Sequence, residues 1–213
     1  MNIRTSKLED LGAIVGIYNQ AIVAGQKTAE TKPVTIDSHR KWFDCHTADK
    51  YPILIAENEN EITGYLTISP YRPGRQALRY TAEVSYYVDF DHHGRGIASN
   101  LLQHVIGLCP SLDIKTLFAI ILDSNQGSIR LLEKYGFKKW GHLPRVADFD
   151  GIEVGHLYYG LRIENELQDD LMRPCSICRT LNAKDEGSDG SESNSSSCSC
   201  CLIRNEYRLE SCQ

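Results

Sequence analysis

The stretch "YTAEVSYYVDFDHHGRGIASNLL", residues 80–102, joins a strand pattern to a helix pattern through a glycine loop. Its first nine residues alternate between two faces, which is typical of a β-strand. Ile97, Leu101 and Val105 then follow at helical spacing. The N–H groups of a first helical turn have no partner within the helix and attract anions. The stretch therefore predicts an α/β unit with a phosphate site at its turn.

Within the turn, Gly94 and Gly96 let the backbone approach a phosphate, and Arg95 adds positive charge. The sequence lacks the Gly-x-x-x-x-Gly-Lys-Ser/Thr loop of nucleoside triphosphatases, and the glycine spacing differs from that of dinucleotide-binding folds. A tight turn that only feeds a helix is the plainer alternative.

Around this unit, strand and helix patterns alternate along the chain. Residues 2–4 read as a strand, and 8–22 as a helix with Leu8 on its apolar face. Residues 36–46 read as a helix capped by Asp37 or Ser38. Further strands are expected at 51–58, 61–69, 116–123, 137–146 and 153–163, and a helix at 125–136. The order β-α-α-β-β-β-α-β-α-β-β predicts a mixed sheet of about six to seven strands flanked by helices.

Composition limits the classes of function. The 213 residues carry 28 acidic and 23 basic side chains for a net charge of -5, so no basic surface indicates nucleic acid. No apolar run reaches the roughly 20 residues of a membrane span, and the start has no signal-peptide core. We expect a cytoplasmic protein that acts on a small polar molecule, with no nucleic acid or membrane as partner.

A change of composition near residue 165 predicts a domain over 1–164 and a tail over 165–213. The tail is rich in Ser, Gly and acidic residues, which favours disorder. It also holds six of the eight cysteines, whose Cys-x2-Cys and Cys-x-Cys spacings leave zinc binding and lipidation as alternatives. We expect that the domain itself requires no metal.

These motifs resemble those of the GNAT superfamily of N-acetyltransferases, whose pyrophosphate motif is Gln/Arg-x-x-Gly-x-Gly/Ala. Here "HGRGIA" matches except that His93 replaces Gln or Arg. The family's Asn-x-x-Ser pair and Gly-Phe helix end are matched by "NQGS" and Gly136-Phe137, although each is also an ordinary helix cap or stop. The resemblance implies acetyl-coenzyme A (acetyl-CoA) as co-substrate. The implied cofactor contacts are Tyr87, Val88, His93, Gly94, Arg95, Gly96, Ile97, Ala98, Asn125 and Ser128.

A closer resemblance is to the phosphinothricin and methionine sulfoximine branch of that family. It covers residues 1–163 through "IYNQAI", "RKWF", "YPILIAE" and "SPYRPGRQALRYTAEVSYYV". The branch implies acetylation of an amino acid or its analogue in a ternary complex, and a homodimer. It also implies that Glu30 lines the substrate site; Arg72 and Arg75 can clamp a substrate carboxylate, with a solvated loop as the alternative. The branch's later Gly-x-Lys and Trp are absent, and the segment there offers His142, His156 and Asp148 instead.

Acetyl transfer needs a base, and Glu83 is the candidate because burial in an apolar strand raises a carboxyl pKa. The alternative is that Glu83 faces solvent and pairs with Arg75 or Arg79. Backbone N–H groups near Tyr87 and Val88 are expected to hold the thioester carbonyl. Leu132 occupies the position where many relatives carry a tyrosine acid.

Two other functions remain open from the sequence. One keeps the chemistry and moves the substrate to a polyamine or a peptide N-terminus. The other is an acetyl-CoA sensor without turnover, suggested by Leu132 and His93.

Overall fold

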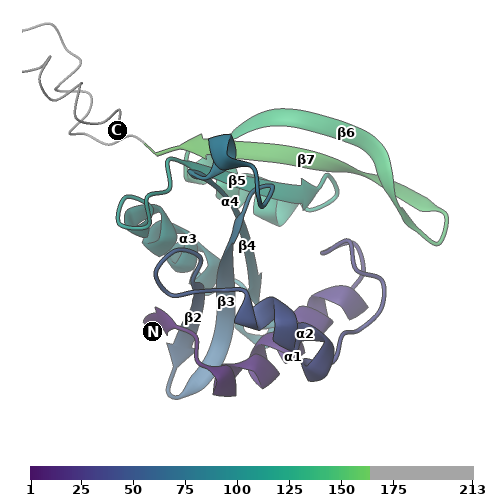
Figure 1. Ribbon diagram of the computed structural model, residues 1–213. Helices are drawn as coiled ribbons and strands as arrows, with labels where there is room; N and C mark the ends of the chain where they lie inside the picture. The colour runs from purple at the N-terminus through teal and green to yellow at the C-terminus, as the bar shows by residue number, and fades with distance from the viewer. Residues whose placement is uncertain (164–213) are drawn as a thin grey trace, which may run out of the picture. The chain divides into compact units, whose positions relative to one another are not determined.

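The computed structural model describes residues 1–163, in which seven strands form one mixed sheet of order β1-β2-β3-β4-β5-β7-β6 (Figure 1). The parallel pairing joins β4 to β5, and the other neighbours are antiparallel. The strands are β1 (Asn2–Thr5), β2 (Ile53–Asn58), β3 (Glu61–Pro70), β4 (Thr81–Val88), β5 (Thr116–Leu122), β6 (Lys138–Phe149) and β7 (Ile152–Arg162). The helices are α1 (Leu11–Val23), α2 (Ile36–Asp44), α3 (Ile97–Leu108) and α4 (Gln126–Lys134), with short 3-10 turns at Leu8–Asp10, Gln76–Leu78 and Phe90–His92.

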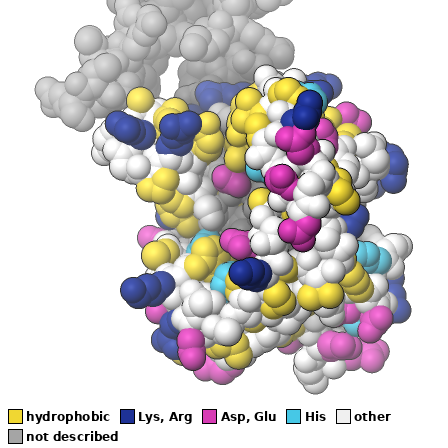
Figure 2. All heavy atoms as spheres, turned by 90° about the vertical axis from the view of Figure 1, so that its right-hand side faces the viewer, with side chains coloured by type: hydrophobic (Ala, Val, Ile, Leu, Met, Phe, Trp, Pro, Cys, Tyr) yellow, Lys and Arg dark blue, Asp and Glu magenta, His cyan; other side chains and the backbone are white. Residues whose placement is uncertain are grey.

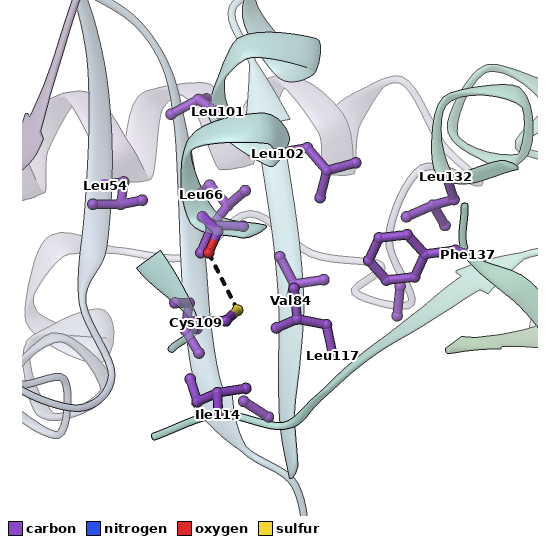
Figure 3. Packing of buried hydrophobic residues seen from close by; sticks show 14 of the residues in the cluster. Leu54, Leu66, Val84, Leu101, Leu102, Cys109, Ile114, Leu117, Leu132 and Phe137 are labelled. Carbon is purple, nitrogen blue, oxygen red and sulfur yellow. Dashed lines mark hydrogen bonds between the residues drawn. The ribbon is translucent and has the colours of Figure 1, made fainter. Parts of the chain in front are cut away.

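Helices cover both faces of the sheet, as its strand patterns require. The larger core lies under α3 and α4, where Leu101 and Leu102 are fully buried against Leu66 and Leu117 (Figure 3). The smaller core lies under α1 and α2 around Ile14, with Tyr18 and Trp42 packed against it. Because successive residues of a strand point to opposite faces, β4 contributes side chains to both layers.

The element order predicted from the sequence is confirmed along the whole described chain. Two local predictions were wrong. Thr35, rather than Asp37 or Ser38, caps α2: its hydroxyl accepts from the Ser38 N–H at 3.1 Å. Leu8 lies in a 3-10 turn before α1 and is 42% exposed, so the apolar face of the helix begins at Leu11.

The sheet opens between β4 and β5. Pairing between these parallel strands runs only from Thr81–Thr116 to Glu83–Phe118. Both strands continue beyond this point, and β5 stays paired with β7 up to Leu122. Within residues 1–163, the second half of β4 therefore has no paired strand on its β5 side, which leaves a wedge-shaped gap in the middle of the sheet.

The hairpin of β6 and β7 extends well beyond the remainder of the sheet (Figure 1). Within residues 1–163, no helix is both long and apolar enough to cross a membrane. The predicted tail at 165–213, with its proposed disorder and its alternatives of zinc or lipid attachment, lies outside the described residues.

Candidate active site

A cleft of about 570 Å³ lies at the open end of the wedge between β4 and α4. Its walls come from the end of β4, the glycine loop, the start of α3 and the first turns of α4, with Ala21 and Lys27 reaching it from the end of α1 and the following loop. Figure 2 shows the molecule hollowed on the face toward which the β6–β7 hairpin points, with acidic side chains on the rim. The predicted cofactor residues that line the cleft are Tyr87, Val88, His93, Gly94, Gly96, Ile97, Ala98, Asn125 and Ser128.

The glycine loop has the geometry of an anion cradle. Gly94 and Gly96 have φ of +74° and +76°, a region that glycine adopts at low cost. Gly96 is the N-cap of α3 and provides no side-chain oxygen, so the N–H groups of Ile97 and Ala98 stay available to a ligand. A Cβ built on either glycine meets no heavy atom within 4 Å, so the space in front of the loop is open. A phosphate fits this cradle.

Two other loop residues have roles that the sequence did not show. His93 Nε2 donates to the Val88 carbonyl at 3.0 Å and ties the loop to the end of β4. The Arg95 guanidinium donates to the Asp91 carbonyl at 3.1 Å. Arg95 is absent from the residues that line the cleft, so the structure does not place this predicted contact with the others.

The start of α4 forms the opposite wall. Asn125 caps this helix, since its side-chain oxygen accepts from the Ser128 N–H at 3.2 Å, and both residues line the cleft. Gly136, at φ +83°, ends the helix, and the Phe137 N–H bonds back to the Leu132 carbonyl at 3.1 Å. The capping and stop readings are thus both correct, and the cap also faces the cleft.

Hydrogen bonds at the two ends of β4 show which backbone groups face the gap. The Tyr71 N–H donates to the Thr81 carbonyl at 3.2 Å, and the Asp89 N–H donates to the Thr63 carbonyl at 3.0 Å. Odd-numbered residues of β4 therefore direct their backbone groups toward β3.

Even-numbered residues direct theirs toward β5, as the bond from the Lys115 N–H to the Tyr80 carbonyl at 2.8 Å also indicates. Beyond Glu83, no strand in the described part of the chain pairs with this edge. The even-numbered residues beyond Glu83 are Val84, Tyr86 and Val88. Val84 directly follows the last paired residue, so the N–H groups well inside the gap are those of Tyr86 and Val88. The Val88 N–H thus faces the gap and the Tyr87 N–H faces β3, while both residues line the cleft.

Glu83 is the last residue of β4 paired with β5, so its side chain lies where the gap begins. It is half-buried, and burial raises its pKa. Among the described residues Glu83 has no salt bridge, so the alternative pairing with Arg75 or Arg79 is not seen. A carboxylate with a raised pKa at a gap in the sheet suits a general base.

Ser69 and His46 adjoin this base and were missed by the sequence analysis. Ser69 on β3 lies directly opposite Glu83. His46 Nδ1 is 2.8 Å from the Trp42 carbonyl, and its Nε2 is 3.1 Å from Ser69 Oγ. A carbonyl only accepts, so Nδ1 carries the proton and Ser69 donates to Nε2. Burial lowers the pKa of His46, which favours this neutral form. The oxygen lone pairs of Ser69 then remain available beside Glu83.

An aromatic wall lies on the other side of Glu83. Phe118, opposite Glu83 on β5, is 8% exposed and contacts three rings. Its centroid is 4.8 Å from that of Tyr71, 5.5 Å from Tyr158 and 5.8 Å from Trp140. These residues are far apart in sequence. The pairing of β3 with β4, which continues through β5 and β7 to β6, brings them together.

The three predicted substrate residues lie outside the cleft. Arg72 and Arg75 line a separate hollow of about 490 Å³ next to Tyr71, which connects their loop to the aromatic wall. Glu30 lies near His39: burial lowers the pKa of this histidine, and the Glu30 carboxylate opposes that change. Within residues 1–163, no group of three or more His, Cys, Asp or Glu side chains is arranged to hold a metal ion.

Comparison with known proteins establishes the class of protein that this fold and site define. Residues 19–137, more than half of the chain, match the model of the acetyltransferase (GNAT) family. The chain belongs to this family and is an acetyltransferase.

Individual relatives narrow the class. The chain is 40% identical over 152 residues to "Putative phosphinothricin acetyltransferase YwnH" of Bacillus subtilis (strain 168), covering 71% of this chain and 92% of that protein. It is 34% identical over 149 residues to an L-methionine sulfoximine/L-methionine sulfone acetyltransferase of Pseudomonas paraeruginosa, covering 68% and 85%. A crystal structure of a GNAT superfamily phosphinothricin acetyltransferase from Sinorhizobium meliloti, in complex with acetyl-CoA, superposes with TM-score 0.73 at 25% identity, covering 82% of this chain and 93% of that one.

Proposed function

We propose that this protein transfers the acetyl group of acetyl-CoA to the amine of a small amino acid or amino acid analogue, in a ternary complex without a covalent intermediate. The observation that carries this proposal is the position of Glu83 at the point where β4 and β5 separate. The names of the relatives, which refer to phosphinothricin and methionine sulfoximine, support the substrate class.

The residues present fit acetyl-CoA. The positive-φ glycines and the uncapped first turn of α3 suit its pyrophosphate. The gap between the strands suits its narrow pantetheine arm, and the N–H groups of Tyr86 and Val88 can donate to a carbonyl there. Acetyl-CoA supplies the acetyl group as a thioester, and no metal is required for that chemistry.

The Glu83 side chain acts on the amine from the face of the sheet that α1 and α2 cover, opposite to the face under α3 and α4. Strand alternation places its side chain on the α1–α2 side, together with Tyr87, whereas Val84 belongs to the core under α3 and α4. The amine and the thioester then meet through the gap. Glu83 removes a proton from the substrate ammonium, directly or through a water, and the amine nitrogen forms a C–N bond as the C–S bond breaks.

Charge and shape around Glu83 support an amino acid substrate. Ser69 Oγ can accept from the ammonium, the wall around Phe118 can hold an apolar substituent, and Arg72 or Arg75 can bind a carboxylate. Glu30 is proposed as a further ammonium contact. A homodimer located in the cytoplasm completes the proposal, with no nucleic acid or membrane as partner.

The test is thiol release from acetyl-CoA with a panel of amines: free amino acids, methionine sulfoximine, phosphinothricin, polyamines and short peptides. We expect the highest kcat/KM for an amino acid analogue, and a large loss when its carboxylate is replaced by a carboxamide. Arg75→Ala should reduce the difference in kcat/KM between the carboxylate and the carboxamide, because the carboxylate then loses a charged partner. Turnover of polyamines or peptides alone would select the alternative substrates. Acetyl-CoA binding without turnover of any amine would select the sensor.

A further inference from the structure

Tyr86 lines the cofactor cleft, and its buried hydroxyl makes no hydrogen bond to the residues that the structure describes. Among residues 1–163, Tyr86 Oη is the buried side-chain polar atom that has no hydrogen bond. A buried hydroxyl without a hydrogen-bond partner normally destabilises the folded state. Tyr86 lines the cleft and approaches Ser128 on the opposite wall. A polar group left unpaired at such a cost indicates a ligand partner.

Leu132, at the position where many relatives carry a tyrosine acid, cannot donate a proton or a hydrogen bond. Leu132 has an exposed fraction of 0% and packs with Phe137 in the core (Figure 3). Ser128 and Leu132 are four residues apart on α4 and share one face of that helix. Tyr86 therefore approaches the same helical face from the opposite wall of the cleft.

The other tyrosine near this helix is already engaged. Tyr135 Oη is 2.6 Å from Ser99 Oγ, in the first turn of α3, with Lys134 Nζ 3.5 Å from the same oxygen. That cluster lies at the phosphate end of the cleft, next to the glycine loop. Tyr86 instead belongs to the part of β4 whose backbone faces the gap.

We propose that Tyr86 Oη–H donates a hydrogen bond to the sulfur of the departing CoA thiolate. This inference rests on the proposed function, since it takes acetyl-CoA as the bound co-substrate. The electron pair of the broken C–S bond stays on sulfur, and the hydrogen bond spreads its charge.

Tyr86 keeps its own proton in this role. Burial raises its pKa to about 12, partly offset by Ser128. An ordinary thiol has a pKa of about 8.5, so the thiolate is too weak a base to deprotonate such a phenol. The thiolate takes its proton from solvent afterwards or leaves as an anion.

The experiment titrates the thiol of bound CoA by its ultraviolet thiolate absorbance, in the full chain and in Tyr86→Phe. The wild-type hydroxyl stabilises the thiolate, so we expect the pKa of the bound thiol to rise by about one in the variant. The value of kcat should fall about tenfold or more, with KM for acetyl-CoA nearly unchanged. Tyr135→Phe is the matched control, because it removes a phenolic hydroxyl from the phosphate end and should leave the thiol pKa unaltered.

Folding does not confound this test. Phenylalanine removes only the unpaired hydroxyl, so the ligand-free variant should melt at the same or a higher temperature. An unchanged thiol pKa in Tyr86→Phe would overturn the proposal. Weaker CoA binding by Tyr86→Phe with an unchanged kcat would also overturn it, because the hydroxyl would then contact the pantetheine arm rather than the sulfur. Failure of the wild type to bind CoA would instead overturn the proposed function, and with it this inference. The titration needs no amine, so a wrong substrate class leaves its result intact.

Discussion

Glu83 and Phe118 form the last residue pair in the parallel pairing of β4 with β5, and the two strands diverge immediately after them. The carboxyl group thus lies at the apex of the gap, with the aromatic wall on one side and Ser69 on the other. Backbone N–H groups that face the gap begin just beyond it. This one pairing relates the base, the carbonyl donors and the substrate wall.

The pH dependence of the reaction follows from the burial of Glu83. Its pKa is raised by desolvation, and only the ionised carboxylate can accept a proton. We expect kcat/KM to rise with pH through an inflection above the ordinary value for a glutamate. Initial rates over a pH series measure it. The fall in kcat/KM at acidic pH should be absent in Glu83→Gln. If the variant keeps this fall, the ionisation belongs to another group.

The same ionisation predicts a difference in stability. The folded state holds the Glu83 proton more tightly than the unfolded chain, so stability falls as pH rises through the window between the two pKa values and stays lower above it. Glu83→Gln removes this effect. Its Tm should exceed that of the wild type by a margin that grows from acidic to neutral pH. Calorimetry across that range tests this; a constant margin would contradict it.

The glycine cradle predicts a separable effect on binding. Gly96→Ala places a Cβ in the open space before α3 and forces a strained φ of +76°, which costs about 1–2 kcal/mol of unfolding free energy. The Kd for acetyl-CoA should rise about tenfold or more, as measured calorimetrically. Gly151→Ala is the control, since Gly151 also has positive φ and open space but lies in the β6–β7 turn. Equal losses of affinity in both variants would mean that only stability had changed.

The aromatic wall depends on Gly160. A Cβ there would collide with the Trp140 ring, so Gly160→Ala must displace that ring from Phe118. The KM for the amine should rise roughly two- to tenfold, while KM for acetyl-CoA stays nearly constant. Steady-state kinetics with each substrate varied measures both values. Gly141→Ala, whose Cβ makes an ordinary 3.8 Å contact with Tyr158, should have little effect on either KM.

Sequence reasoning was most successful where the signal is local and periodic. The order of strands and helices, the glycine loop and the position of Glu83 all depend on neighbouring residues along the chain. The cap of α2 was mispredicted because Thr35, Asp37 and Ser38 all carry suitable oxygens within four residues. Which of them caps depends on where the helical turn begins.

Contacts set by tertiary pairing could not be read from the sequence. The choice between Tyr87 and Val88 depends on the β3–β4 register, which determines the neighbour that each N–H faces. His46 reaches Ser69 only because α2 packs on the sheet. The unpaired hydroxyl of Tyr86 likewise emerges only when the opposite wall of the cleft is in place.

The most direct test of the account compares thiol release by the wild type and by Glu83→Gln, at a pH above the acidic inflection. Acetyl-CoA binding is measured alongside by calorimetry. We predict a fall in kcat of about 100-fold or more, with Kd for acetyl-CoA nearly unchanged, because the amide occupies the same space but cannot accept the proton. A variant that binds acetyl-CoA and turns over the amine at the wild-type rate would contradict the assignment of Glu83 as the base.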